Sequence, residues 1–244
     1  MKIVISGYGR MGHEVEKVAN AHNHEVIASL DEESDWLKKK DIIKTADVIV
    51  DFSLPETALD VFERSFKLGV PIVTGTTGWY DEMEKVKSLC NKNEATFFFS
   101  PNFSIGMNIF FHANKLVAKL SAASNVYKAS MEETHHIHKL DAPSGTAIKI
   151  ADDIIDEFPS LTEWKNDLEA EENQLPIISY REGEVIGDHT VKYESEVDIL
   201  EISHHAKSRK GFALGAVMAA EFIIGKKGFY SMNDLMAELQ KKVK

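Results

Sequence analysis

Residues 2–12, KIVISGYGRMG, join a short apolar strand pattern to a glycine-rich turn. The apolar run ends at Ser6, and Gly7, Gly9 and Gly12 follow in the spacing G-x-G-x-x-G. In this spacing the first glycine permits a tight turn, the second lets a pyrophosphate approach the backbone, and the third allows close helix–strand packing. The amides at the start of the following helix would face the phosphates. The stretch therefore predicts the first unit of a dinucleotide-binding fold, with a purely structural glycine turn as the alternative.

Apolar runs recur through the first hundred residues and alternate with helical patterns. Nearly continuous runs at residues 25–30, 46–53, 70–77 and 95–100 are typical of strands that are buried on both faces. Residues 13–22 show a helical apolar stripe between the first two strands. This alternation predicts an α/β fold with a Rossmann-type, doubly wound parallel sheet.

An acidic residue stands where a dinucleotide's ribose would lie. Asp31 ends the second predicted strand, 19 positions after Gly12, and its carboxylate would accept hydrogen bonds from ribose hydroxyls. Glu32 and Glu33 follow with no adjacent basic residue, so a 2′-phosphate would meet three carboxylates. We therefore expect NADH to be preferred over NADPH; the alternative is that Lys38, Lys39 and Lys40 fold back to meet the phosphate.

The pattern changes after SPNFSIG, residues 100–106. A helix is expected next, with one apolar stripe formed by Ile109, Ala113, Leu116, Val117 and Leu120. A strand and a second helix follow, and residues 160–176 are polar and acidic, which favours a surface loop. Short apolar runs at 177–183, 189–195 and 197–206 are typical of antiparallel strands, and the chain then becomes helical again.

These patterns predict two domains. Residues 1–105, completed by C-terminal helices at about 214–244, would bind the dinucleotide. Residues 106–213 would form an α+β domain with a mostly antiparallel sheet that serves substrate binding and oligomerisation.

The stretch EETHHIHKLDAPSGTA, residues 132–147, carries the densest group of chemically active side chains. An apolar helical stripe after it predicts a helix that starts near Ser144, whose first-turn amides could bind an anion. His135 and Lys139 lie just before that start and could deliver protons to a substrate whose carboxylate is held there. A capping turn without a ligand is the alternative. A metal site is disfavoured, because the chain has no H-E-x-x-H helix and only one cysteine.

Composition limits the function classes. The formal net charge of −11 argues against a nucleic-acid partner, and an anionic substrate would need a local positive site. The single cysteine excludes an intramolecular disulfide. No long apolar run predicts a membrane span or signal segment, so we expect a cytoplasmic protein.

The quoted motifs carry a family resemblance. HHIHKLDAPSGTA closely resembles the signature of the 4-hydroxy-tetrahydrodipicolinate reductases, also called dihydrodipicolinate reductases. GYGRMG, DFS, TGTTG, NFSIG, SYREGEVIGDH, HHAKSR and FALGA extend the resemblance over essentially the whole chain. It implies a homotetramer in lysine and diaminopimelate biosynthesis that reduces a cyclic dicarboxylate with NADH or NADPH.

The resemblance also implies residue roles. His135 and Lys139 would supply protons, and His136, Gly145 and Thr146 would bind substrate, with Ser144 at the same helix start. The cofactor would contact Gly7, Tyr8, Gly9, Arg10, Met11, Gly12, Asp31, Gly75, Thr76, Thr77, Ser100, Pro101, Asn102 and Phe103. His204, His205 and Arg209 fit a structural role as well as substrate binding. Two rival functions remain: a Rossmann oxidoreductase for an amino or hydroxy acid, and a non-catalytic dinucleotide sensor.

Overall fold

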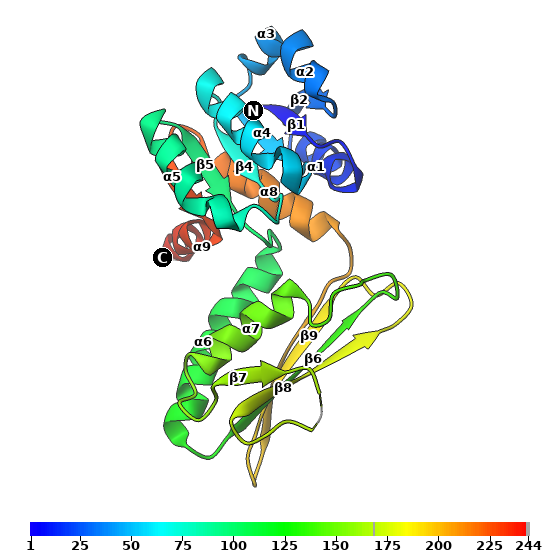
Figure 1. The fold of residues 1–244 in the computed structure, drawn as a ribbon, viewed down its shortest axis with the longest axis vertical. Helices are drawn as coiled ribbons and strands as arrows, with labels where there is room; N and C mark the ends of the chain where they lie inside the picture. The colour runs from blue at the N-terminus through cyan, green and yellow to red at the C-terminus, as the bar shows by residue number, and fades with distance from the viewer. Residues whose placement is uncertain (168, 243–244) are drawn as a thin grey trace. The chain divides into compact units, whose positions relative to one another are not determined.

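The structure is a computed structural model that describes residues 1–167 and 169–242. Leu168, inside the predicted loop 160–176, and Val243 and Lys244, inside the predicted C-terminal helices, lie outside the described residues. The chain divides into two compact units (Figure 1). Met1–Ile105 and the segment from Arg209 onward form the first, and Gly106–Ser208 forms the second.

The first unit contains a six-stranded sheet in the order β11-β5-β4-β3-β1-β2, in which every pairing is parallel. The predicted Rossmann-type sheet is thereby confirmed. Its strand β11 was not predicted, because its four residues lie between two helical patterns. The strands are β1 (Lys2–Ser6), β2 (Glu25–Leu30), β3 (Val48–Asp51), β4 (Ile72–Thr74), β5 (Thr96–Phe99) and β11 (Gly228–Ser231).

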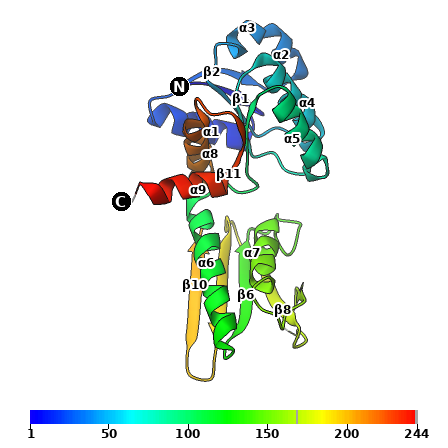
Figure 2. The same ribbon diagram turned by 90° about the vertical axis from the view of Figure 1, so that its left-hand side faces the viewer.

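Helices cover both faces of this sheet, each over its own apolar core (Figures 1 and 2). One face is covered by α1 (Arg10–Ala21), α8 (Lys210–Ile223) and α9 (Met232–Lys241). The other is covered by α2 (Glu33–Lys38), α3 (Lys40–Ile43), α4 (Pro55–Leu68), the 3₁₀ turn η1 (Tyr80–Glu82) and α5 (Met83–Lys92). Covering on both faces explains why the strands are continuous apolar runs instead of alternating ones.

The two glycines of α8 differ sharply in their surroundings. A Cβ on Gly215 would lie 1.7 Å from the carbonyl oxygen of Phe103, whereas a Cβ on Gly211 would meet nothing within 4 Å. We expect Gly215→Ala to destabilise the protein by about 1–3 kcal/mol or more through overpacking. Gly211→Ala, the matched control in the same helix, should stabilise it by roughly 0.4–1 kcal/mol through reduced unfolded-state entropy. Urea unfolding of both variants measures this, and equal effects would contradict the close packing of α8.

The second unit contains a five-stranded sheet in the order β10-β9-β6-β8-β7, with α6 (Ile105–Ser124) and α7 (Gly145–Ile155) on one face (Figure 2). The predicted α+β architecture is confirmed, but the sheet is mixed. Strand β8 pairs in parallel with β6 and β7, and only the pairings of β9 are antiparallel. The reason is that α7 lies on the crossover from β6 to β7, and such a crossover returns the chain in the same direction. The strands are β6 (Lys128–His135), β7 (Glu163–Lys165), β8 (Gln174–Arg181), β9 (Asp188–Glu194) and β10 (Ile199–His205).

Two predictions in this unit were wrong in detail. The predicted loop 160–176 contains β7 and the first residues of β8. The predicted apolar stripe of α6 is mostly its outer face: Ile109, Leu116 and Leu120 are more than half exposed. The helix instead buries polar residues such as Asn114, which accepts a 2.7 Å hydrogen bond from the Tyr193 hydroxyl. Because that partner lies far along the chain, the local apolar pattern could not reveal the buried face.

Candidate active site

The glycine turn lies at the carboxyl end of β1, where α1 begins. Gly7 has a φ of +79°, and a Cβ there would lie 2.3 Å from the carbonyl oxygen of Phe52. A Cβ on Gly12 would lie 2.5 Å from the carbonyl oxygen of Gly7, whereas Gly9 has nothing within 4 Å of its Cβ position. Gly9 thus leaves open backbone beside the N-terminus of α1, which suits a pyrophosphate. Tyr8, Arg10 and Met11 lie in the same turn and first helical residues.

Asp31 directly follows β2 at the same edge of the sheet. The backbone amide of Tyr8 donates to its Oδ1 at 3.2 Å, which holds the exposed carboxylate beside the glycine turn. The neighbouring lysines have other partners. Lys39 contacts Asp35 at 2.9 Å and the carbonyl of Ser29 at 2.7 Å, and Lys38 donates to Ser34. The hydrogen bond from Lys39 lowers the pKa of Asp35 to about 2.

The loops after β4 and β5 reach this same edge, because carboxyl ends of parallel strands lie together. Several of their side chains hold the loops themselves. Thr76 is buried and donates to Asp51 at 2.8 Å, Ser100 bonds the backbone of Asn102, and Phe103 packs against Phe52. Thr77 and Pro101 are exposed, and a Cβ on Gly75 would collide with the Phe52 ring. These loops could therefore offer a ligand mainly backbone groups.

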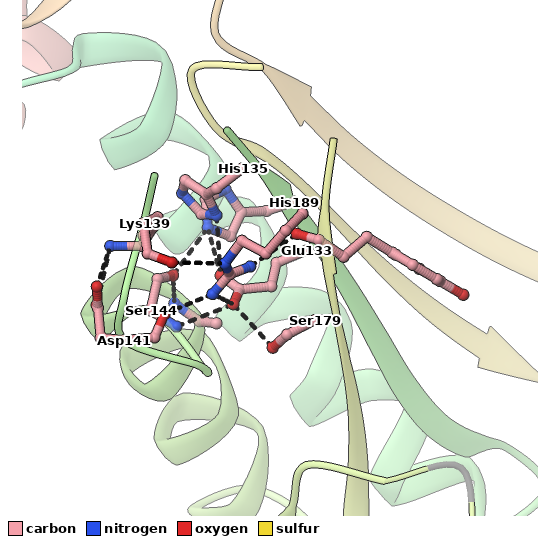
Figure 3. A network of polar contacts seen from close by, with 10 residues as sticks. Glu133, His135, Lys139, Asp141, Ser144, Ser179 and His189 are labelled. Atoms are coloured by element: carbon pink, nitrogen blue, oxygen red, sulfur yellow. Dashed lines mark hydrogen bonds and ion pairs between the residues drawn. The ribbon is translucent and has the colours of Figure 1, made fainter. Parts of the chain in front are cut away.

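The predicted active stretch spans the end of β6 and the loop that leads to α7. His135 is buried at the end of the strand, and Lys139 follows in the loop, where its Nζ contacts both carboxylate oxygens of Asp141 at 2.8 Å (Figure 3). Burial opposes ionisation of Asp141, but this lysine holds the pKa of its carboxyl below the usual value. His136 is half-buried, and His138 is exposed beside Glu184.

Helix α7 begins at Gly145, as the sequence predicts. Ser144 is its buried N-cap and accepts from the amide of Ala147 at 3.1 Å. Gly145 is exposed, with open space where a Cβ would be, and Thr146 lies next to it in the first turn. Backbone amides at such a helix start attract anions, so a carboxylate could approach the glycine closely.

A buried carboxylate that the sequence reading missed organises this region. Glu133 lies two residues before His135 on the same face of β6, and its Oε2 is 3.3 Å from Nδ1 of His135 (Figure 3). Its Oε1 accepts from the amide of Ser144 at 3.0 Å and from Ser179 at 2.8 Å. Arg181 lies 3.4 Å away and also donates to the carbonyls of Lys139 and Asp141. Side chains two positions apart on a strand share a face, so the position of Glu133 two residues before His135 was the sequence signal that could have identified it.

Glu133, His135 and His189 form a group whose ligand atoms lie within 4.8 Å of one another, the spacing of a possible metal site. The sequence motifs did not indicate His189, which lies on β9. The Arg181 guanidinium lies beside Glu133, and two further donors, the Ser144 amide and the Ser179 hydroxyl, bond its carboxylate. This environment favours a proton over a metal ion between the three side chains.

His204 and His205, for which the sequence fits a structural role as well as substrate binding, lie on β10. His204 pairs in register with His189, and burial lowers its pKa. His205 contacts Asp188 at 3.0 Å. Arg209 is the N-cap residue of α8 in the first unit.

Family comparisons agree with this arrangement. Residues 1–103 match the family described as "Dihydrodipicolinate reductase, N-terminus", and residues 106–236 match "Dihydrodipicolinate reductase, C-terminus". The chain belongs to the dihydrodipicolinate reductase family. The resemblance drawn from the sequence motifs is thereby confirmed.

Relatives cover the full length of the chain. A 4-hydroxy-tetrahydrodipicolinate reductase of Christiangramia forsetii is 42% identical over 99% of this chain and 100% of its own. That of Archaeoglobus fulgidus is 35% identical over 97% of this chain and 100% of its own. Among solved structures, a dipicolinate-bound dihydrodipicolinate reductase from Paenisporosarcina is 26% identical with a TM-score of 0.75, covering 95% of this chain and 97% of that one.

Proposed function

We propose that this protein reduces 4-hydroxy-tetrahydrodipicolinate to tetrahydrodipicolinate with a nicotinamide dinucleotide, in lysine and diaminopimelate biosynthesis. Family membership over both parts of the chain supports the reaction. The observation that carries the chemistry is the succession of His135, Lys139 and the open helix start at Gly145 within eleven residues. This succession offers two proton donors beside a carboxylate-binding group.

Each residue has a distinct part in the proposed reaction. One ring carboxylate binds the backbone at Gly145 and Thr146, supported by the Ser144 cap, and His136 contacts the ring. Lys139 leaves Asp141 and meets the substrate as a point charge and proton donor. His135 gives a proton to one atom of the double bond as the other atom is reduced. A bound ring dicarboxylate, dipicolinate, in the Paenisporosarcina relative supports a substrate of this shape.

The dinucleotide supplies the hydride when it is bound. The glycine turn, Asp31, the backbone at Gly75–Thr77 and the backbone at Ser100–Phe103 would hold it. Open backbone at Gly9 and the position of Asp31 beside Tyr8 support this assignment.

We expect NADH to give a higher kcat/KM than NADPH. Asp31 and Glu32 are exposed at the end of β2, while Lys39 is held by Asp35, so a 2′-phosphate would lie beside two carboxylates. Hydrogen bonds to a charged group contribute about 1.5–3 kcal/mol. Asp31→Ala should therefore reduce the ratio of kcat/KM with NADH to kcat/KM with NADPH at least roughly tenfold. Glu25→Ala, at the other end of β2, is the control. An NADPH preference in the wild type would contradict this expectation.

A coupled assay tests the reaction itself. Purified protein is mixed with NADH, and a dihydrodipicolinate synthase supplies the unstable ring substrate while absorbance of NADH is followed. We expect oxidation that depends on the synthase. Activity on amino or hydroxy acids instead would favour the rival oxidoreductase, and dinucleotide binding without turnover would favour the sensor.

The uncovered sheet face bears on the assembly of the protein, and the cysteine content bears on its location. One face of the five-stranded sheet has no covering helix among the described residues, and Tyr180 and Ile199 on that face are 46% and 59% exposed. These features support a homotetramer built through this sheet, which light scattering would detect as four times the 27.4 kDa chain mass. A monomeric mass would refute it.

No helix among residues 1–167 and 169–242 is long and apolar enough to cross a membrane. The single, buried cysteine supports a reducing, cytoplasmic location, which fractionation of cells would test.

A further inference from the structure

Glu133 is a buried charge whose two oxygens face different partners. Its side chain is fully buried, and its Oε1 accepts hydrogen bonds from Ser144, Ser179 and Arg181. Its Oε2 is also buried and has no aligned hydrogen-bond donor among the described residues. Burying an unsatisfied carboxylate oxygen is unfavourable, so a fold keeps one where it serves a purpose.

Two imidazoles face that oxygen. Nδ1 of His135 lies 3.3 Å from Oε2, and Nε2 of His189 lies 3.8 Å from it. The two rings meet edge to face, with centroids 5.2 Å apart. His135 therefore lies in a fixed position between a carboxylate and a second ring (Figure 3).

Burial and neighbouring groups set the charges of Glu133 and His189. Burial opposes ionisation of Glu133, but the nearby His135 ring and the hydrogen bonds from Ser144 and Ser179 outweigh it and hold its pKa well below the usual range. Burial, and then the neighbouring His135, lowers the pKa of His189 to about 4, so this ring is neutral at pH 7. The other charged or titratable groups around the pair are Arg181 on β8, Asp188 on β9, His204 on β10, and Lys139 and Asp141 in the loop.

The opposite side of the His135 ring is left clear by a glycine. A Cβ on Gly187 would lie only 3.0 Å from Nε2 of His135. Any larger residue would crowd the one ring nitrogen that does not face Glu133. The glycine thus places no side chain over Nε2 on that side.

We propose that Glu133 is the positioning residue for His135, holding the proton on Nδ1 so that Nε2 is the atom that exchanges a proton with the substrate. This inference rests on the proposed reduction. As the double bond accepts a hydride at one end, Nε2–H of the imidazolium gives its proton to the other end, and the N–H electron pair stays on the ring. The neutral ring keeps its Nδ1–H toward Oε2, and solvent returns the proton to Nε2. His189 stays neutral and supports the ring edge.

Glu133→Gln tests the proposal, because the amide keeps the shape but removes the charge. We expect kcat to fall at least about tenfold, with little change in the KM for NADH. This loss is part of the rate acceleration of about 10²–10⁴-fold that a general acid typically supplies. Removing an anion next to an imidazolium lets it lose its proton at lower pH. The alkaline limb of the pH profile of kcat should therefore move to lower pH, an effect that a merely structural role would not produce.

Two further variants separate orientation from folding. Ser179→Ala removes a donor to Oε1 but leaves the side facing His135, so its pH profile should match that of the wild type. Glu133→Asp keeps the charge but retracts it by one methylene, so kcat should fall between those of the wild type and Glu133→Gln while the alkaline limb stays. If Glu133→Gln does not fold, a wild-type kcat in Glu133→Asp overturns the proposal.

The outcomes distinguish this inference from the function on which it rests. Wild-type protein that is active in the coupled assay, together with an equally active Glu133→Gln with an unmoved pH profile, overturns the role of Glu133 alone. Wild-type protein without that activity overturns the proposed function. An active wild type with the losses and shift described above supports both.

Discussion

Replacing Lys139 with alanine should lower kcat by about 10²–10⁴-fold, the range typical of a lost proton donor. The KM for the dicarboxylate should also rise, because the ammonium group is proposed to meet the substrate directly. In the structure this ammonium group is paired with the carboxylate of Asp141. A substrate carboxylate would compete with Asp141 for the same cation.

The binding of NADH should be unaffected, since Lys139 belongs to the second unit and the glycine turn to the first. Dinucleotide fluorescence titration measures binding, and the coupled assay measures turnover. Lys128→Ala, which removes an exposed lysine at the start of β6, is the matched control. Unchanged turnover in Lys139→Ala would remove this residue from the proposed chemistry.

His135→Gln should cause a comparable loss of kcat. Glutamine retains a hydrogen-bonding group, but it cannot deliver a proton near neutral pH as an imidazole can. The remaining activity should lose the part of its pH dependence that depends on the imidazolium. His138→Gln is the control, because His138 is three residues away but exposed and paired with Glu184. Equal activity in both variants would argue against His135 as the proton donor.

The parts of the fold that the sequence predicted are those governed by local patterns. The first five strands of the parallel sheet are continuous apolar runs, and each lies within its predicted range. Helix α7 begins after Ser144, because a serine cap precedes a regular apolar stripe. In both cases neighbouring residues carry the whole signal.

Long-range pairing explains the misses. Strand β11 is defined by its parallel pairing with β5, more than a hundred residues earlier, and has only four residues of its own. The buried face of α6 depends on the hydrogen bond between Asn114 and Tyr193, 79 residues apart. Apolar residues lie on several sides of that helix, so its periodicity alone favoured the wrong face.

The residues of the candidate site also divide into those that local sequence indicates and those that only long-range contacts bring together. His135, Lys139 and the helix start at Gly145 lie within one short stretch, and their chemistry was apparent from the residue types. Ser179 and Arg181 reach Glu133 from 46 and 48 residues away. No sequence spacing indicates those contacts, although the alternation along β6 could have drawn attention to Glu133 itself.

A crystal structure with NADH and pyridine-2,6-dicarboxylate, a planar ring dicarboxylate, tests the central claim most directly. We predict one carboxylate on the backbone amides of Gly145 and Thr146, Lys139 turned from Asp141 toward the ligand, and Nε2 of His135 facing the ring. A dicarboxylate bound elsewhere, or a His135 ring turned away from it, would contradict the account.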